Sequence, residues 1–163
     1  MANEEPKPGP RYQALLQLLR TAETIWNASR LFFQQWDLSP SQFNILNLLR
    51  GSSEGLTQID LSRELITHRS NITGLIDRLE KRALVQRKTS PFDRRVWRVS
   101  LTKDGAELIR EILPSYYRLI EQVWGDTPLA KAELIAKQLK HLTTEAEHIT
   151  TDLEKSQEKN NKH

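Results

Sequence analysis

The stretch over residues 56–105 constrains the fold most, because capped helices and a change of hydrophobic period follow one another within it. Thr57 stands three residues before Asp60, which is the spacing of a capping box and predicts a short helix. Thr67 is the next N-cap candidate, and apolar residues at steps of three and four predict a second helix over 67–82. Two short helices joined by a tight turn are typical of a helix-turn-helix.

The first turns of the second helix carry a polar and basic face, which is expected of a recognition helix that enters the major groove. Short polar side chains near a helix N-terminus can approach phosphates closely, while Asn and Arg can read base edges. A solvated helix face is the alternative for the same pattern. The residues expected at the DNA are His68, Arg69, Ser70, Asn71, Thr73, Gly74 and Arg78.

After this helix the apolar period falls to about two, which predicts strands over 85–89 and 96–101 joined by a turn. A basic hairpin that follows a helix-turn-helix is a wing. We expect the aspartate of the turn to pair with one adjacent arginine while the other arginine enters the minor groove; both arginines could instead only shape the loop. The wing residues expected at the DNA are Arg87, Lys88, Asp93, Arg94 and Arg95, the first two through non-specific phosphate attraction.

Charge is concentrated in the same stretch. Residues 56–103 hold eleven Lys and Arg against five Asp and Glu, a net charge of +6, whereas the whole chain carries +3. The rest of the chain is therefore at −3. Such clustering is the electrostatic footprint of double-stranded DNA as a partner.

The flanking segments predict helices that associate with one another or with a second copy. Residues 1–10 are expected to form a loose arm, and 11–37 a long helix with a broad apolar face. Ser39 and Gln42 have the spacing of another capping box and predict a helix that ends near Gly51, and Thr102 is expected to cap the helix after the wing. Within 106–153, Pro114 is expected to be tolerated by its helix or to bend it, and three-four spacing in the last helix suggests helix association. Residues 154–163 are expected to fray. The whole chain is expected to form a single domain, with 38–105 as its DNA-binding lobe.

Composition excludes several classes of protein. The chain has no cysteine, and therefore no disulfide or thiol-based metal site. No apolar run reaches the roughly 18 residues that a membrane span needs, and the first residues lack the pattern of a signal peptide. A cytoplasmic location without membrane contact follows. Phosphate-binding glycine loops and nucleophile motifs are missing as well, so we expect no enzyme and no cofactor.

Two further side-chain groups carry weaker hypotheses. His141, Glu145 and His148 share one helix face and could hold zinc, but a solvated stripe is the more common meaning of this spacing, and we expect no metal. An aromatic set could line a ligand pocket, although core and dimer packing accounts for each member more simply. Its members are Trp26, Phe33, Trp36, Tyr116, Tyr117 and Trp124.

Three segments in this order and spacing resemble the MarR (multiple antibiotic resistance regulator) family. Residues 75–82 (LIDRLEKR) resemble the second half of its recognition helix, 91–95 (PFDRR) its wing tip, and 101–105 (LTKDG) the start of the following helix. The family usually has glycine where this chain has Ala83, so we expect an altered turn and an extended helix there.

The resemblance implies a mainly α fold with a small β-wing, in which a winged helix-turn-helix lobe is joined to dimerising terminal helices. It also implies a homodimeric repressor that binds a pseudo-palindromic operator through the helix 67–82 and the wing 85–101. A small aromatic or phenolic effector is a further partner that the resemblance suggests. The alternative is a winged-helix module for protein interaction or antirepression that binds no specific DNA.

Overall fold

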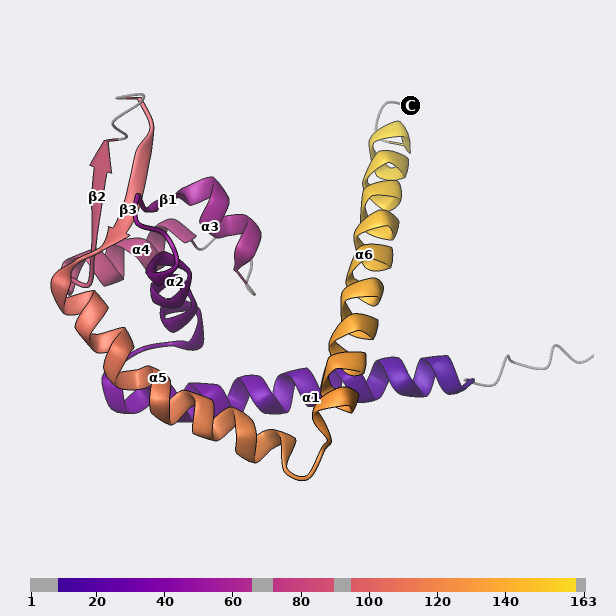
Figure 1. Cartoon of the computed structure of the whole chain (residues 1–163). Helices are drawn as coiled ribbons and strands as arrows, with labels where there is room; N and C mark the ends of the chain where they lie inside the picture. The colour runs from indigo at the N-terminus through magenta and orange to yellow at the C-terminus, as the bar shows by residue number, and fades with distance from the viewer. Residues whose placement is uncertain (1–8, 66–71, 90–94, 161–163) are drawn as a thin grey trace, which may run out of the picture. The chain divides into compact units, whose positions relative to one another are not determined.

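The computed structural model describes residues 9–65, 72–89 and 95–160, which form helices and one small sheet (Figure 1). The chain divides into two compact units, Met1–Leu113 and Pro114–His163. In chain order the elements are α1 (Pro10–Phe33), a 3-10 turn (Gln34–Trp36), α2 (Pro40–Arg50), β1 (Leu56–Thr57), α3 (Gln58–Glu64), α4 (Ile72–Lys81), β2 (Val85–Thr89), β3 (Trp97–Leu101), α5 (Lys103–Trp124) and α6 (Leu129–Asn160). This confirms the mainly α fold with a small β-wing.

The short helices begin where the capping signals predict. Ser39 and Gln42 form a complete capping box at α2, and Thr57 and Asp60 form another at α3. The Thr102 hydroxyl accepts a hydrogen bond from the Gly105 N–H at 3.0 Å, at the start of α5. Each of these bonds satisfies a backbone donor that the first helical turn leaves unpaired.

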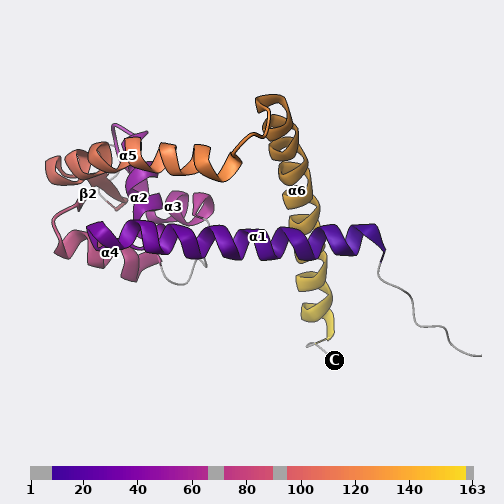
Figure 2. The same cartoon turned by 90° about the horizontal axis from the view of Figure 1, so that it is seen from below.

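The core of the first unit lies where α2, α3 and α4 meet the sheet and the start of α5. Its most deeply buried large side chains come from α1 to α5 and from strands β2 and β3, and each is less than 2% exposed: Phe33, Ile45, Leu46, Leu49, Leu61, Ile76, Leu79, Val85, Val99, Ile109 and Ile112. Only the C-terminal end of α1 joins this core, and its N-terminal turns extend beyond the lobe (Figure 2).

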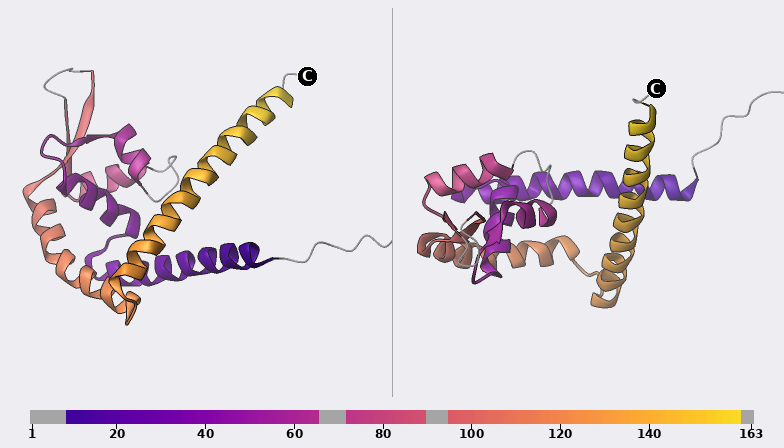
Figure 3. Two further views of the ribbon diagram at one scale, coloured as in Figure 1. Left: turned by 45° about the vertical axis from the view of Figure 1, so that its right-hand side comes forward. Right: turned by 90° about the horizontal axis from the view of Figure 1, so that it is seen from above.

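The sheet has three strands rather than the two expected. The order is β1-β3-β2, with Leu56 opposite Val99 on one side of β3 and Arg87 opposite Val99 on the other. Strand β1 is only two residues long and ends at the cap of α3, so periodicity could not reveal it. The longer strands β2 and β3 run antiparallel and project from the lobe (Figure 3).

The expected extension of the helix through Ala83 is wrong. Helix α4 ends at Lys81, and Ala83 takes the left-handed conformation with φ +55°. The Ala83 N–H donates to the Glu80 carbonyl at 2.8 Å, and the Leu84 N–H donates to the Leu79 carbonyl at 3.0 Å. These two bonds form a Schellman motif, which ends the helix although the residue is not glycine.

The second unit contains the end of α5 and the whole of α6. Pro114 lies within α5 without ending it, and Gly125, at φ +51°, follows the last helical residue. Helix α6 continues to Asn160, beyond Leu153, where we expected fraying to begin. Within the described ranges, no helix combines the length and the apolar character that crossing a bilayer requires.

Candidate nucleic-acid interface

Helix α4 has one buried face and one exposed face. Ile72, Leu75, Ile76 and Leu79 point into the core, whereas Thr73 and Arg78 are exposed and Gly74 is half-buried. An amphipathic helix fixed by four core residues presents its other face rigidly to a partner. The remaining residues expected on this face, His68, Arg69, Ser70 and Asn71, lie outside the described residues.

Arg87 connects the wing to α4. Its Nη2 lies 2.5 Å from Asp77 Oδ1, and its Nη1 is hydrogen-bonded to Glu80 Oε2. The backbone N–H of Arg87 also donates to Glu80 Oε1 at 3.0 Å. Two carboxylates spaced by one helical turn therefore hold both the side chain and the backbone of one strand residue.

The electrostatics of this cluster keep Arg87 charged. Burial alone would lower the pKa of the guanidinium, but the hydrogen bond to Asp77 and the charge of Glu80 outweigh burial and raise the pKa above its ordinary value. With two carboxylates around one guanidinium, the three side chains have a formal sum of −1. The cluster therefore supplies rigidity between β2 and α4 rather than positive charge.

Two other arginines of the lobe are committed to backbone oxygens. Arg82 donates to the Asp37 carbonyl at 2.5 Å and to the Trp36 carbonyl at 3.0 Å, which ties the end of α4 to the turn before α2. Arg98 donates from Nη1 to the Gly55 carbonyl at 2.9 Å. The side chains of Lys88 and Arg95 are exposed, and Asp93 and Arg94 lie outside the described residues.

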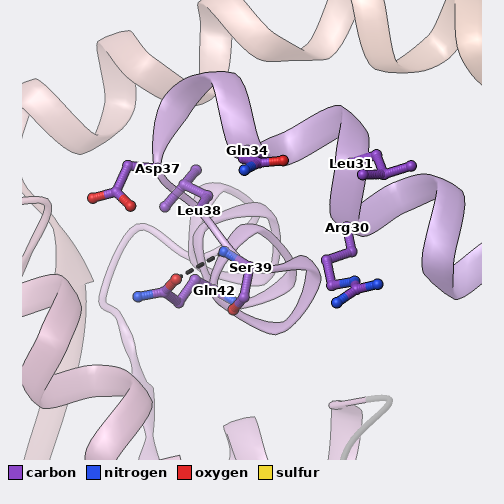
Figure 4. A pocket seen from close by; sticks show the side chains of 7 residues that line it. All are labelled: Arg30, Leu31, Gln34, Asp37, Leu38, Ser39 and Gln42. Atoms are coloured by element: carbon purple, nitrogen blue, oxygen red, sulfur yellow. Dashed lines mark hydrogen bonds between the residues drawn. The ribbon is translucent and has the colours of Figure 1, made fainter.

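A hollow of about 460 Å³ opens where α1 meets the start of α2 (Figure 4). Its floor contains the capping box of α2, in which the Ser39 N–H donates to Gln42 Oε1 at 2.8 Å. A neighbouring hollow of about 570 Å³ shares Ser39 and Gln42 and is bordered by Arg78, Lys81 and Arg82. The basic residues at the C-terminal end of α4 thus face an open, polar surface.

The weaker hypotheses find limited structural counterparts. Phe33 is buried and stacks on Phe43 with ring centroids 4.2 Å apart, and Trp36 Nε1 donates to Glu111 Oε1 at 2.8 Å. His141 Nδ1 lies 3.8 Å from Glu145 Oε1 in α6. Across the described ranges, no three His, Cys, Asp or Glu side chains gather closely enough to hold a metal ion.

Sequence reasoning missed Asp77 and Glu80 as members of the site. The available signal was an acidic pair three residues apart on a helix whose other charged residues are basic. That spacing places both carboxylates on one helix face. Their partner could not be identified, because it depends on how the strand packs against the helix.

A helix-turn-helix whose second helix is bonded to a basic β-hairpin defines a winged helix-turn-helix protein. Comparison with known proteins agrees: residues 36–96 match the MarR family. The transcriptional regulator YsmB of Bacillus subtilis is 32% identical over 127 residues, which is 76% of this chain and 86% of that protein. The regulator PapX of Escherichia coli is 28% identical over 142 residues, or 84% of this chain and 87% of PapX.

A solved structure of Bordetella bronchiseptica BpsR, described for the regulation of its DNA binding by 6-hydroxynicotinic acid, is 28% identical. The match covers 80% of this chain and 98% of the BpsR chain, with a TM-score of 0.66. The chain belongs to the MarR family of DNA-binding transcriptional regulators, which confirms the resemblance stated from the sequence.

Proposed function

We propose that this regulator binds a pseudo-palindromic operator as a homodimer and represses transcription by occupying a promoter. In this proposal the helix containing α4 enters the major groove, and the wing reaches the adjacent minor groove. It acts in the cytoplasm by binding rather than by catalysis.

The exposed face of α4 is the observation that carries the proposal. Thr73 and Arg78 are exposed outside the buried apolar face, and the hydrogen bonds that Arg87 donates to Asp77 and Glu80 fix the basic hairpin beside this helix. A rigid pair of elements, one helix and one ribbon, suits two neighbouring grooves of a duplex. We assign Arg87 to positioning the wing, in place of the phosphate contact expected from the sequence.

Apolar surface on each unit supports a dimer. In the first unit, α1 exposes Tyr12, Leu15, Leu19, Ile25, Trp26 and Leu31. In the second unit, α6 exposes Leu134, Ile135, Leu139, Leu142, Ile149 and Leu153 at helical spacing. A second copy of the chain is the partner we assign to these exposed apolar side chains, because burying them in a homodimer would remove them from water.

An effector is the remaining part of the proposal. The description of BpsR names a small aromatic acid that regulates its DNA binding. We extend only the chemical class, a small aromatic molecule, to this chain. The expected result is that the effector lowers DNA affinity without changing the salt dependence of the residual binding.

The test of DNA binding is selection of bound sequences from a random duplex pool at two salt concentrations. We expect enrichment of one pseudo-palindrome, with affinity that falls steeply as salt rises. Arg78→Ala should weaken specific binding, whereas Arg110→Ala, which removes the same charge from the exposed surface of α5, should not. Recovery of no motif, with binding lost at physiological salt, would favour a winged-helix module whose partner is a protein.

The positioning role of Arg87 is tested separately by Arg87→Ala and Arg87→Lys. Both variants lose the paired side-chain bonds to Asp77 and Glu80. Alanine has no side-chain donor, and lysine cannot reproduce the planar fork of a guanidinium. We expect both to weaken operator binding, and the lysine variant to do so although its charge is retained. Full rescue by lysine would mean that the charge of Arg87, rather than its geometry, serves DNA binding.

A further inference from the structure

A hollow of about 320 Å³ lies at the base of the wing, beside the cluster that joins the wing to α4. Gln58 of α3, Arg87 of β2, and Trp97 and Val99 of β3 line it. Of these four residues, only Arg87 belongs to the set that sequence reasoning assigned to DNA contact. The sequence predicted no role in DNA binding for the other three lining residues.

Strand register places the aromatic wall of this hollow. Thr89 pairs with Trp97 and Arg87 pairs with Val99, so Trp97, Val99 and Arg87 lie on one face of the ribbon. Val99 is 1% exposed and belongs to the core, whereas Trp97, two residues nearer the wing tip, is 57% exposed. The apolar face of the ribbon thus continues past the edge of the core as a single large aromatic side chain.

The chemistry inside the hollow differs from that around it. Inside, the Arg87 guanidinium is bonded to Asp77 and Glu80, so the hollow offers little net positive charge to a phosphate. Its other lining is an indole, an aliphatic side chain and the neutral amide of Gln58. The exposed basic side chains of the wing lie outside this hollow: Lys88 pairs with Arg98 and is on the opposite face of the ribbon, and Arg95 lies in the turn before β3.

A neutral, aromatic hollow on a basic wing suits the uncharged sugars of a nucleic-acid strand rather than its phosphates. We propose that Trp97 packs against a deoxyribose of the DNA strand that passes between the wing and α4, with the Gln58 amide bonded to a neighbouring backbone oxygen. This inference rests on the proposed function, since it assumes that the wing and α4 face the duplex. Aromatic side chains supply much of the contact energy in such interfaces because they bury large area with few rotatable bonds.

The experiment measures the affinity of Trp97→Ala, Trp97→Phe and Ile59→Ala for the selected operator and for an unrelated duplex. Ile59 is the matched control, because it is a 63% exposed apolar residue next to Gln58 that does not line the hollow. We expect Trp97→Ala to weaken binding to both duplexes by the same factor, about tenfold, as for an aromatic side chain at a nucleic-acid interface. Trp97→Phe should restore most of the affinity, and Ile59→Ala should match the wild type.

The salt dependence separates sugar packing from a charge effect. A contact with deoxyribose releases no counterion, so Trp97→Ala should leave the slope of log K against log salt unchanged. Wild-type affinity in Trp97→Ala, a changed salt slope, or a loss confined to the operator would each overturn the inference. If the wild type itself binds no duplex, the proposed function fails first, and the two failures are therefore distinguishable.

Discussion

Replacing Ala83 by glycine is expected to stabilise the protein, although it enlarges no contact. Ala83 sits at φ +55° in the Schellman motif that ends α4, and its side chain is exposed, so removing the methyl group sacrifices no packing. A left-handed conformation costs a non-glycine residue about 1–2 kcal/mol. Against this, glycine lowers the free energy of unfolding by about 0.4–1 kcal/mol, because it gives the unfolded chain more conformational entropy. With both terms at the middle of their ranges, the difference favours Ala83→Gly by about 0.8 kcal/mol.

Urea denaturation at fixed protein concentration measures this difference, because dimerisation would make apparent stability depend on concentration. We expect the midpoint to rise without a change in the m-value. The matched control is Ala106→Gly in the first turn of α5, where the backbone is right-handed and glycine should destabilise by about 1 kcal/mol. Destabilisation by Ala83→Gly of the same size as in the control would refute the strain argument.

Three further outcomes follow from local geometry. Gly105→Ala should destabilise by about 3 kcal/mol in urea denaturation, because the new Cβ would lie 2.0 Å from the Leu84 carbonyl oxygen. Hydrogen bonds from the Thr57 side chain and backbone lower the pKa of the Asp60 carboxyl below its ordinary value of 3.8. The ionised carboxylate therefore stabilises the folded protein above that pH, and this contribution is lost as pH falls through the folded pKa. Asp60→Asn should flatten this part of the acid-unfolding curve. Trp36→Phe should cost about 1 kcal/mol or less, and a double-mutant cycle with Glu111→Ala, which removes the acceptor, should attribute that loss to their hydrogen bond.

The sequence predicted those features whose causes are local. The boxes at Ser39 and Thr57 each close within four residues, so their helices begin where the spacing indicates. The strand Val85–Thr89 was also predicted with its observed bounds, because period-two alternation is a property of neighbouring residues. The helix-turn-helix and the wing follow from these elements and their order.

What the sequence could not predict depends on distant partners. Strand β1 exists because Leu56 and Thr57 pair with Val99 and Arg98, more than forty positions along the chain. Ala83 ends α4 despite its side chain, because the buried residues Leu79 and Leu84 hold the Schellman bond between them. Glycine makes this turn easier, but the tertiary packing of those leucines decides that it forms.

The same dependence limits what charge counting says about DNA binding. The net charge of +6 over residues 56–103 treats every arginine as available to phosphates. Arg82, Arg87 and Arg98 are instead bonded to carbonyls or carboxylates of the protein. Because the salt dependence of binding reports only the phosphates that are neutralised, its slope should be smaller than the basic residues of this stretch would indicate. A slope of log K against log salt large enough to include every basic residue of 56–103 would mean that these internal bonds break when DNA binds.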